Sequence, residues 1–123
     1  MEDFVSFEIA KKLKEKGYPQ HIAEDAYIID NYGEEKYNIG DRLPIQYVPD
    51  YMADVAAPTI SQVLKWLREE KEFMVFPVYS TNTSRWYCSI VNADSLDTYK
   101  LSLSDSYEEA ALAGIEYVLD NLI

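Results

Sequence analysis

The sequence predicts an α+β fold, in which an N-terminal helix and a β-hairpin precede an α-β-β-β-α unit. The spacing of apolar residues is helical after residue 58, changes to the strand period at Phe73, and is helical again near the C-terminus. Short loops separate the three strands, which favours an antiparallel meander with the helices packed on one face. A length of 123 residues, 48% of them hydrophobic, suits a single domain, which we place at residues 1–123.

The first helix is expected over residues 4–16, where Ile9 and Leu13 stand four positions apart on one face. Gly17 followed by Pro19 is a typical stop signal. The last turns also carry four lysines, Lys11, Lys12, Lys14 and Lys16. Because cations complement the dipole at the C-terminal end of a helix, we interpret these lysines as a solvated face rather than a basic docking strip.

Residues 21–57 show the least regular pattern. The stretch EDAYIIDNYGEEKYNIG predicts two short strands around the turn NYGEE. The stretch GDRLPIQYVPDYMAD contains two prolines, so any strand there is short or lies at an edge. Five tyrosines fall in this segment, Tyr27, Tyr32, Tyr37, Tyr47 and Tyr51. Two interpretations stay open: tyrosines packed across the hairpin, or a tyrosine-rich binding face.

A second helix is expected to begin at Thr59, which with Gln62 matches a capping box. One buried stripe is formed by Ile60, Val63, Leu64 and Leu67. Trp66 lies about 100° from the centre of that stripe, so it must pack against something beside the helix, either the 21–57 segment or another chain. The candidate partner surface is therefore Trp66, Tyr27, Tyr32, Tyr37 and Tyr47.

Three strands are expected in FMVFPVY, RWYCSIV and DTYKLSL, joined by the loops STNTS and NADSL. Pro77 indicates that the first of them is an edge strand or is interrupted there. In the closing helix, Ser106 and Glu109 match a second capping box. Gly114 stands mid-helix beside the buried stripe, which predicts a close approach of that helix to the sheet.

The residue types exclude most catalytic and metal chemistries. One histidine, His21, and one cysteine, Cys88, cannot form a zinc site of the Cys/His type, and no calcium loop occurs. Four glycines supply no phosphate-binding loop. Cys88 alternates with Trp86 and Ile90, which is typical of a buried, inert thiol rather than half of a dyad with His21. We expect no catalytic residue and no cofactor; a magnesium site built from carboxylates alone is the metal site left open.

The net charge of −11, spread over both halves of the chain, is typical of a protein that repels phosphate backbones and anionic lipids. The order α-β-β-β-α is also that of the double-stranded RNA-binding domain, but Asp105, Glu108 and Glu109 stand where that fold holds basic residues. We therefore expect no nucleic acid and, without a long apolar run, no membrane as partner. A protein partner, preferably basic, would suit this charge. The lone cysteine and the absence of a signal peptide predict a cytoplasmic protein.

Four blocks of sequence resemble small uncharacterised proteins of Bacteroides-type gut bacteria and their phages and prophages: FVSFEIAKKLKEKGYP, APTISQVLKWLREEK, WYCSI and SYEEAALAGIEYVLDNLI. The resemblance implies an intracellular α+β protein of mobile-element origin with no assigned activity, and it carries over no catalytic or binding residue. We expect a small acidic interaction or accessory module. The alternative is a small enzyme with a carboxylate- or tyrosine-based site in residues 21–57.

Overall fold

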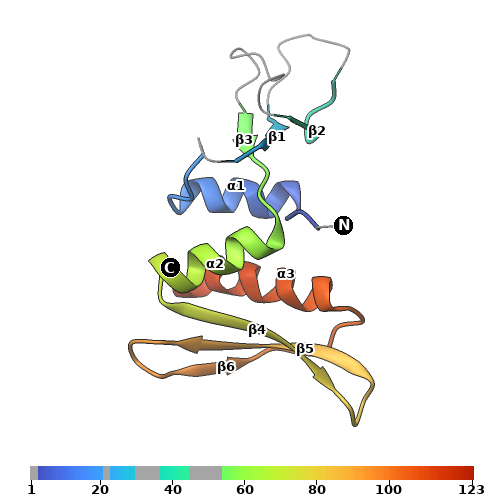
Figure 1. The fold of residues 1–123 in the computed structure, drawn as a ribbon, viewed down its shortest axis with the longest axis vertical. Helices are drawn as coiled ribbons and strands as arrows, with labels where there is room; N and C mark the ends of the chain where they lie inside the picture. Colours follow the sequence, from blue (N-terminus) through green and yellow to red (C-terminus); the bar gives the residue numbers. More distant parts are fainter. Residues whose placement is uncertain (1–2, 21–22, 30–36, 45–53) are drawn as a thin grey trace. The chain divides into compact units, whose positions relative to one another are not determined.

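The computed structural model describes residues 3–20, 23–29, 37–44 and 54–123 (Figure 1). The chain divides into two compact units. We call Phe4–Thr59 the N-terminal unit, and Ile60–Ile123 together with Asp3 the C-terminal unit. The described residues form three α-helices and two three-stranded antiparallel sheets, which confirms the α+β fold.

Helix α1 (Phe7–Glu15) begins three residues later than the sequence predicts. Before it the chain is extended, because Phe4 bridges to Thr59 and the Val5 amide donates to the Pro58 carbonyl over 3.1 Å. Ser6 then caps the helix by accepting a hydrogen bond from the Ile9 amide.

The predicted stop at Gly17 is confirmed. Gly17 has a φ of +92°, a left-handed conformation that glycine adopts without strain. The Tyr18 amide donates to the Leu13 carbonyl over 2.9 Å, and the Gly17 amide donates to the Lys14 carbonyl over 3.2 Å. This pair of hydrogen bonds is a Schellman motif, and it ends α1 one residue earlier than expected.

The sheet of the N-terminal unit has the order β2-β1-β3, formed by β1 (Asp25–Ile28), β2 (Arg42–Pro44) and β3 (Asp54–Ala56). The strand β1 pairs with the next strand in the chain, as a hairpin would. That partner lies beyond Gly40, however, and not directly after NYGEE. The reason is a turn at 38–41, in which the Asp41 amide donates to the Asn38 carbonyl and Asp41 Oδ2 accepts from the Asn38 amide. Pro44 lies in an edge strand, as its missing amide proton predicts.

The C-terminal unit confirms the predicted α-β-β-β-α order (Figure 1). It contains α2 (Ile60–Glu70), β4 (Phe73–Ser80), β5 (Arg85–Asn92), β6 (Thr98–Lys100) and α3 (Tyr107–Tyr117), which continues as one π-helical stretch, η3 (Val118–Leu122). The strands form an antiparallel meander in the order β4-β5-β6, so Pro77 lies in an edge strand, as expected. Both α2 and α3 pack on one face of this sheet.

The close approach predicted at Gly114 is present. A Cβ atom placed on Gly114 would overlap Cys88 Sγ and would lie 2.8 Å from Val75 Cγ1. The N-terminal end of α3 resembles the predicted capping box, since Ser106 Oγ accepts from the Glu109 amide over 3.1 Å. Glu109 Oε2 accepts in return from the amide of Asp105, one residue before the cap. Within the described ranges, no helix has the length and apolar character needed to cross a membrane.

Candidate interaction surface

The sheet β4-β5-β6 has two faces of different exposure. Because side chains alternate along a strand, Val75, Cys88 and Ile90 point to the face covered by α2 and α3, and all three are buried. The register places Met74 opposite Val91 and Val78 opposite Tyr87 on the other face. We call this second face the open face; its residues are Met74, Phe76, Val78, Ser80, Arg85, Tyr87, Ser89, Val91, Thr98 and Lys100.

The open face is apolar at its centre. Phe76 lies opposite Ser89, between Met74 and Val78, and is 48% exposed. Met74, Val78, Tyr87 and Val91 are half-buried. Within the C-terminal unit both α-helices lie on the opposite side of the sheet (Figure 1). An antiparallel sheet with one solvated face normally alternates apolar and polar residues, so this apolar outer face departs from the usual pattern.

The amino-acid sequence of β4 contains a signal for this face. Its run FMVFPVY is continuously nonpolar, whereas a strand with one wet face reads as an alternation. A continuous run is typical of a strand covered on both faces. The part of the open face that β4 contributes therefore has the composition of a covered surface.

Few charges project from the open face. Arg85 Nη2 lies 3.0 Å from Asp105 Oδ1, so its charge is balanced. Lys100 is exposed, and its Nζ lies 4.6 Å from the centroid of the Tyr87 ring. The central part of the face thus combines apolar and aromatic side chains with one cation, in a chain whose net charge is −11.

A second group of exposed rings lies on the helix side of the same sheet. Trp86 packs edge-on against Tyr79 at 5.3 Å and against Tyr107 of α3 at 5.5 Å between ring centroids. Tyr79 and Tyr107 remain 48% and 40% exposed. These mutual ring contacts join β4, β5 and α3, so the group has a structural role within the unit.

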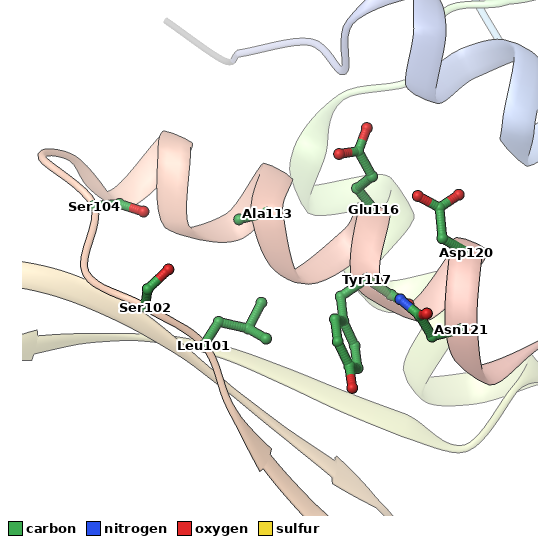
Figure 2. A pocket seen from close by; sticks show the side chains of 8 residues that line it. All are labelled: Leu101, Ser102, Ser104, Ala113, Glu116, Tyr117, Asp120 and Asn121. Carbon is green, nitrogen blue, oxygen red and sulfur yellow. The ribbon is translucent and has the colours of Figure 1, made fainter.

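A groove of about 300 Å³ lies between the segment after β6 and the end of α3 (Figure 2). It is lined by Leu101, Ser102, Ser104, Ala113, Glu116, Tyr117, Asp120 and Asn121. In Figure 2 the carboxylates of Glu116 and Asp120 extend away from the Leu101–Ser104 segment, and the Tyr117 ring points in a different direction. A catalytic site requires reactive groups that converge on one point, and the hydroxyl and carboxylate groups of this groove do not.

The residues predicted as a partner surface have different environments. Tyr27 lies in the core of the N-terminal unit and not on its surface: its hydroxyl donates to the Val5 carbonyl, and its ring centroid lies 5.5 Å from that of Phe7. Burial raises the pKa of Tyr27, and the nearby Arg42 lowers it by a smaller amount. Tyr37 is half-buried, while Tyr32 and Tyr47 lie outside the described residues.

Trp66 is half-buried on α2, with Lys71 Nζ 5.4 Å from the centroid of its ring. Its position beside the buried stripe agrees with the sequence, since Ile60, Val63 and Leu67 are buried and Leu64 is half-buried. That Trp66 packs against the 21–57 segment or another chain stays a prediction.

In the described ranges we identify no arrangement of side chains suited to catalysis or to metal binding. Cys88 is 1% exposed, and burial raises the pKa of its thiol to about 11, with a hydrogen bond from the Phe76 backbone acting in the opposite direction. His21 lies outside the described residues. Among the residues that are described, no group of three or more His, Cys, Asp or Glu side chains could hold a metal ion.

Comparisons with protein-family models, with curated proteins and with solved structures return no match. The functional conclusion therefore rests on the chemistry and geometry of this chain.

Proposed function

We propose that the protein is an interaction module that binds another protein through the open face. The observation that carries this proposal is the exposure of Phe76 at the centre of an apolar sheet face, opposite the face that α2 and α3 cover. Exposed apolar patches rimmed by polar residues are typical of protein-binding sites. An aromatic anchor such as Phe76 supplies a large apolar area when a partner covers it.

A second copy of this chain is a poor occupant. Face-to-face packing would join two chains with a net charge of −11 each. The strands β4 and β5 are eight residues long and β6 is three residues long. The face is therefore about 27 Å long, about 14 Å wide where β6 pairs and about 10 Å wide elsewhere, or roughly 300 Å². A standard protein–protein interface buries about 800 Å² on each partner, so any partner of this face makes a small interface.

Single-stranded nucleic acid also fits poorly. Aromatic sheet faces can stack bases, but binding then depends on several phosphate contacts from lysine or arginine. On the open face the charge of Arg85 is balanced by Asp105, which leaves Lys100. The net negative charge that repels phosphate also disfavours self-association of the chain.

The proposal keeps the mobile-element origin that the resemblance implies and the cytoplasmic accessory role expected from the residues. It moves the binding surface from Trp66 and the tyrosines of residues 21–57 to the C-terminal sheet. The enzyme alternative has no supporting observation among the described residues of 21–57.

The test compares two variants of similar chemistry. Phe76→Ser changes the open face, whereas Leu96→Ser changes a side chain that is 75% exposed in the β5–β6 loop. A partner captured with the intact chain is purified, and its affinity for each variant is measured by calorimetry. Loss of an anchor typically weakens binding about ten-fold or more, and we expect that loss for Phe76→Ser alone. Equal affinity of both variants for the partner would contradict the proposal.

A further inference from the structure

We infer that the element bound by the open face is a single amphipathic α-helix, aligned along β4 and β5, with a carboxylate facing Lys100. This inference rests on the proposed function and adds the shape and charge of the partner. The shape follows from the dimensions of the face, and the charge follows from the side chains that project from it.

The dimensions of the open face match one helix. A helix with its side chains is about 10–12 Å wide, close to the width of the β4-β5 pair, which β6 extends over three residues. About 18 helical residues, at 1.5 Å each, would span the length of the eight-residue strands. On the opposite face of the same sheet, one helix already packs across both strands, because Gly114 of α3 lies against Val75 of β4 and Cys88 of β5.

Addition of a strand at the sheet edge is less suitable. A partner strand needs a row of free amide and carbonyl groups, and Pro77 removes a donor from the middle of β4. At the other edge, β6 is three residues long. The apolar face therefore offers a partner more contact area than either edge strand does. Side chains rather than backbone groups would make the contacts.

The charge of the bound helix follows from Lys100. Lys100 is exposed beside Tyr87. Ser89 of β5 pairs with Lys100 on one side and with Phe76 of β4 on the other. An apolar partner would desolvate part of this ammonium group, and a carboxylate at the flank of the helix would compensate it. The partner helix is thus expected to carry acids locally, although the whole chain would attract a basic protein at long range.

The experiment uses the full chain labelled with ¹⁵N and two synthetic 18-residue helical peptides. Both peptides carry the same leucine stripe at positions i, i+3, i+4 and i+7; one has glutamates at its flanks and the other has lysines. We expect the glutamate peptide to shift the amide signals of Met74, Phe76, Val78, Tyr87 and Val91. Its affinity should exceed that of the lysine peptide about five-fold, the size expected for one exposed charge pair.

Two variants separate charge from shape. In Lys100→Glu the preference should reverse in favour of the lysine peptide, and in Phe76→Ser both peptides should lose binding while Leu96→Ser keeps it. A higher affinity of the unaltered chain for the lysine peptide at this face would overturn the inference, as would the absence of shifts with either helix.

Two further probes distinguish other occupants. An extended peptide of alternating leucine and glutamate that shifts the same signals more strongly would overturn the helix but leave a protein partner in place. Shifts produced there by a single-stranded oligothymidylate, or by raising the concentration of the protein alone, would overturn both the helix and the proposed function.

Discussion

Gly114 of α3 lies directly against Cys88 of β5, so close that a Cβ atom at position 114 would overlap the Cys88 sulfur. The same Cβ atom would lie 2.8 Å from Val75 Cγ1. Both neighbours are buried in the sheet, where packing leaves little room for a shift. The glycine thus sets the distance between α3 and β4-β5.

Gly114→Ala should therefore destabilise the protein by about 1–3 kcal/mol, although alanine has the higher helix propensity. The sequence alone predicts a milder and even stabilising effect of alanine, but the contacts that its Cβ atom would make with Cys88 and Val75 favour the opposite sign. Gly114→Leu should destabilise further. Chemical denaturation measures both, with Ala113→Gly at the exposed neighbouring position as a control for propensity.

A double-mutant cycle tests whether Cys88 causes the effect. Removing the sulfur in Cys88→Ala should make Gly114→Ala less damaging than it is in the unaltered chain, since directly contacting residues couple. Equal effects in both backgrounds would show that the close approach is not the cause.

Leu96 in the β5–β6 loop has a left-handed φ of 67° and is 75% exposed. For a residue other than glycine this conformation costs about 1–2 kcal/mol, and an exposed leucine gains little packing in return. Leu96→Gly should therefore raise the free energy of unfolding by up to about 1 kcal/mol, because glycine also loses more entropy on folding. A lower midpoint of denaturation for Leu96→Gly than for the unaltered chain would show that Leu96 makes contacts that its exposure conceals.

The Cys88 thiol should be unreactive in the folded protein at pH 8. Its pKa is raised to about 11, so at that pH the nucleophilic thiolate is a small fraction, and the sulfur is also buried. A colorimetric disulfide reagent should react slowly with the native chain and rapidly after denaturation. A fast native reaction would indicate that α3 opens readily from the sheet.

Nucleic-acid binding should be absent in spite of the α-β-β-β-α order. At the start of α3, where a double-stranded RNA-binding domain holds basic residues, this chain has Asp105, Glu108 and Glu109. Mobility-shift assays with duplex RNA, duplex DNA and single strands at low salt should show no complex at micromolar protein. A salt-sensitive shift, abolished when the four lysines of α1 and its C-terminal cap are changed to glutamate, would contradict this prediction.

Much of the C-terminal unit could be predicted because its signals are local. The stripe of Ile60, Val63 and Leu67 predicts α2, and the change to a period of two predicts the strands. Pro77 predicts an edge strand because it lacks a donor. Gly114 predicts a close approach, but the identity of its neighbours, which decides the effect of alanine, depends on the tertiary fold.

The N-terminal sheet was harder to predict because its strands are short. β3 has three residues, and it is held by pairing with β1, which no local pattern reveals. Tyr27 illustrates the same limit for the candidate surface. Tyrosine suits both surface and core, and the hydrogen bond from its hydroxyl to the Val5 carbonyl, 22 positions away, selects the core.

Site-specific photocrosslinking tests the binding role of the open face most directly. A photoreactive phenylalanine analogue replaces Phe76 in the full chain, and the matched control carries it at Leu96. On irradiation in the cells that produce the protein, we expect one heavier adduct from position 76 and none from position 96. Fragmentation of that adduct should place the crosslink in an amphipathic helix of another protein. An adduct from position 96 alone, or an adduct from position 76 with a second copy of this chain or with nucleic acid, would contradict the account.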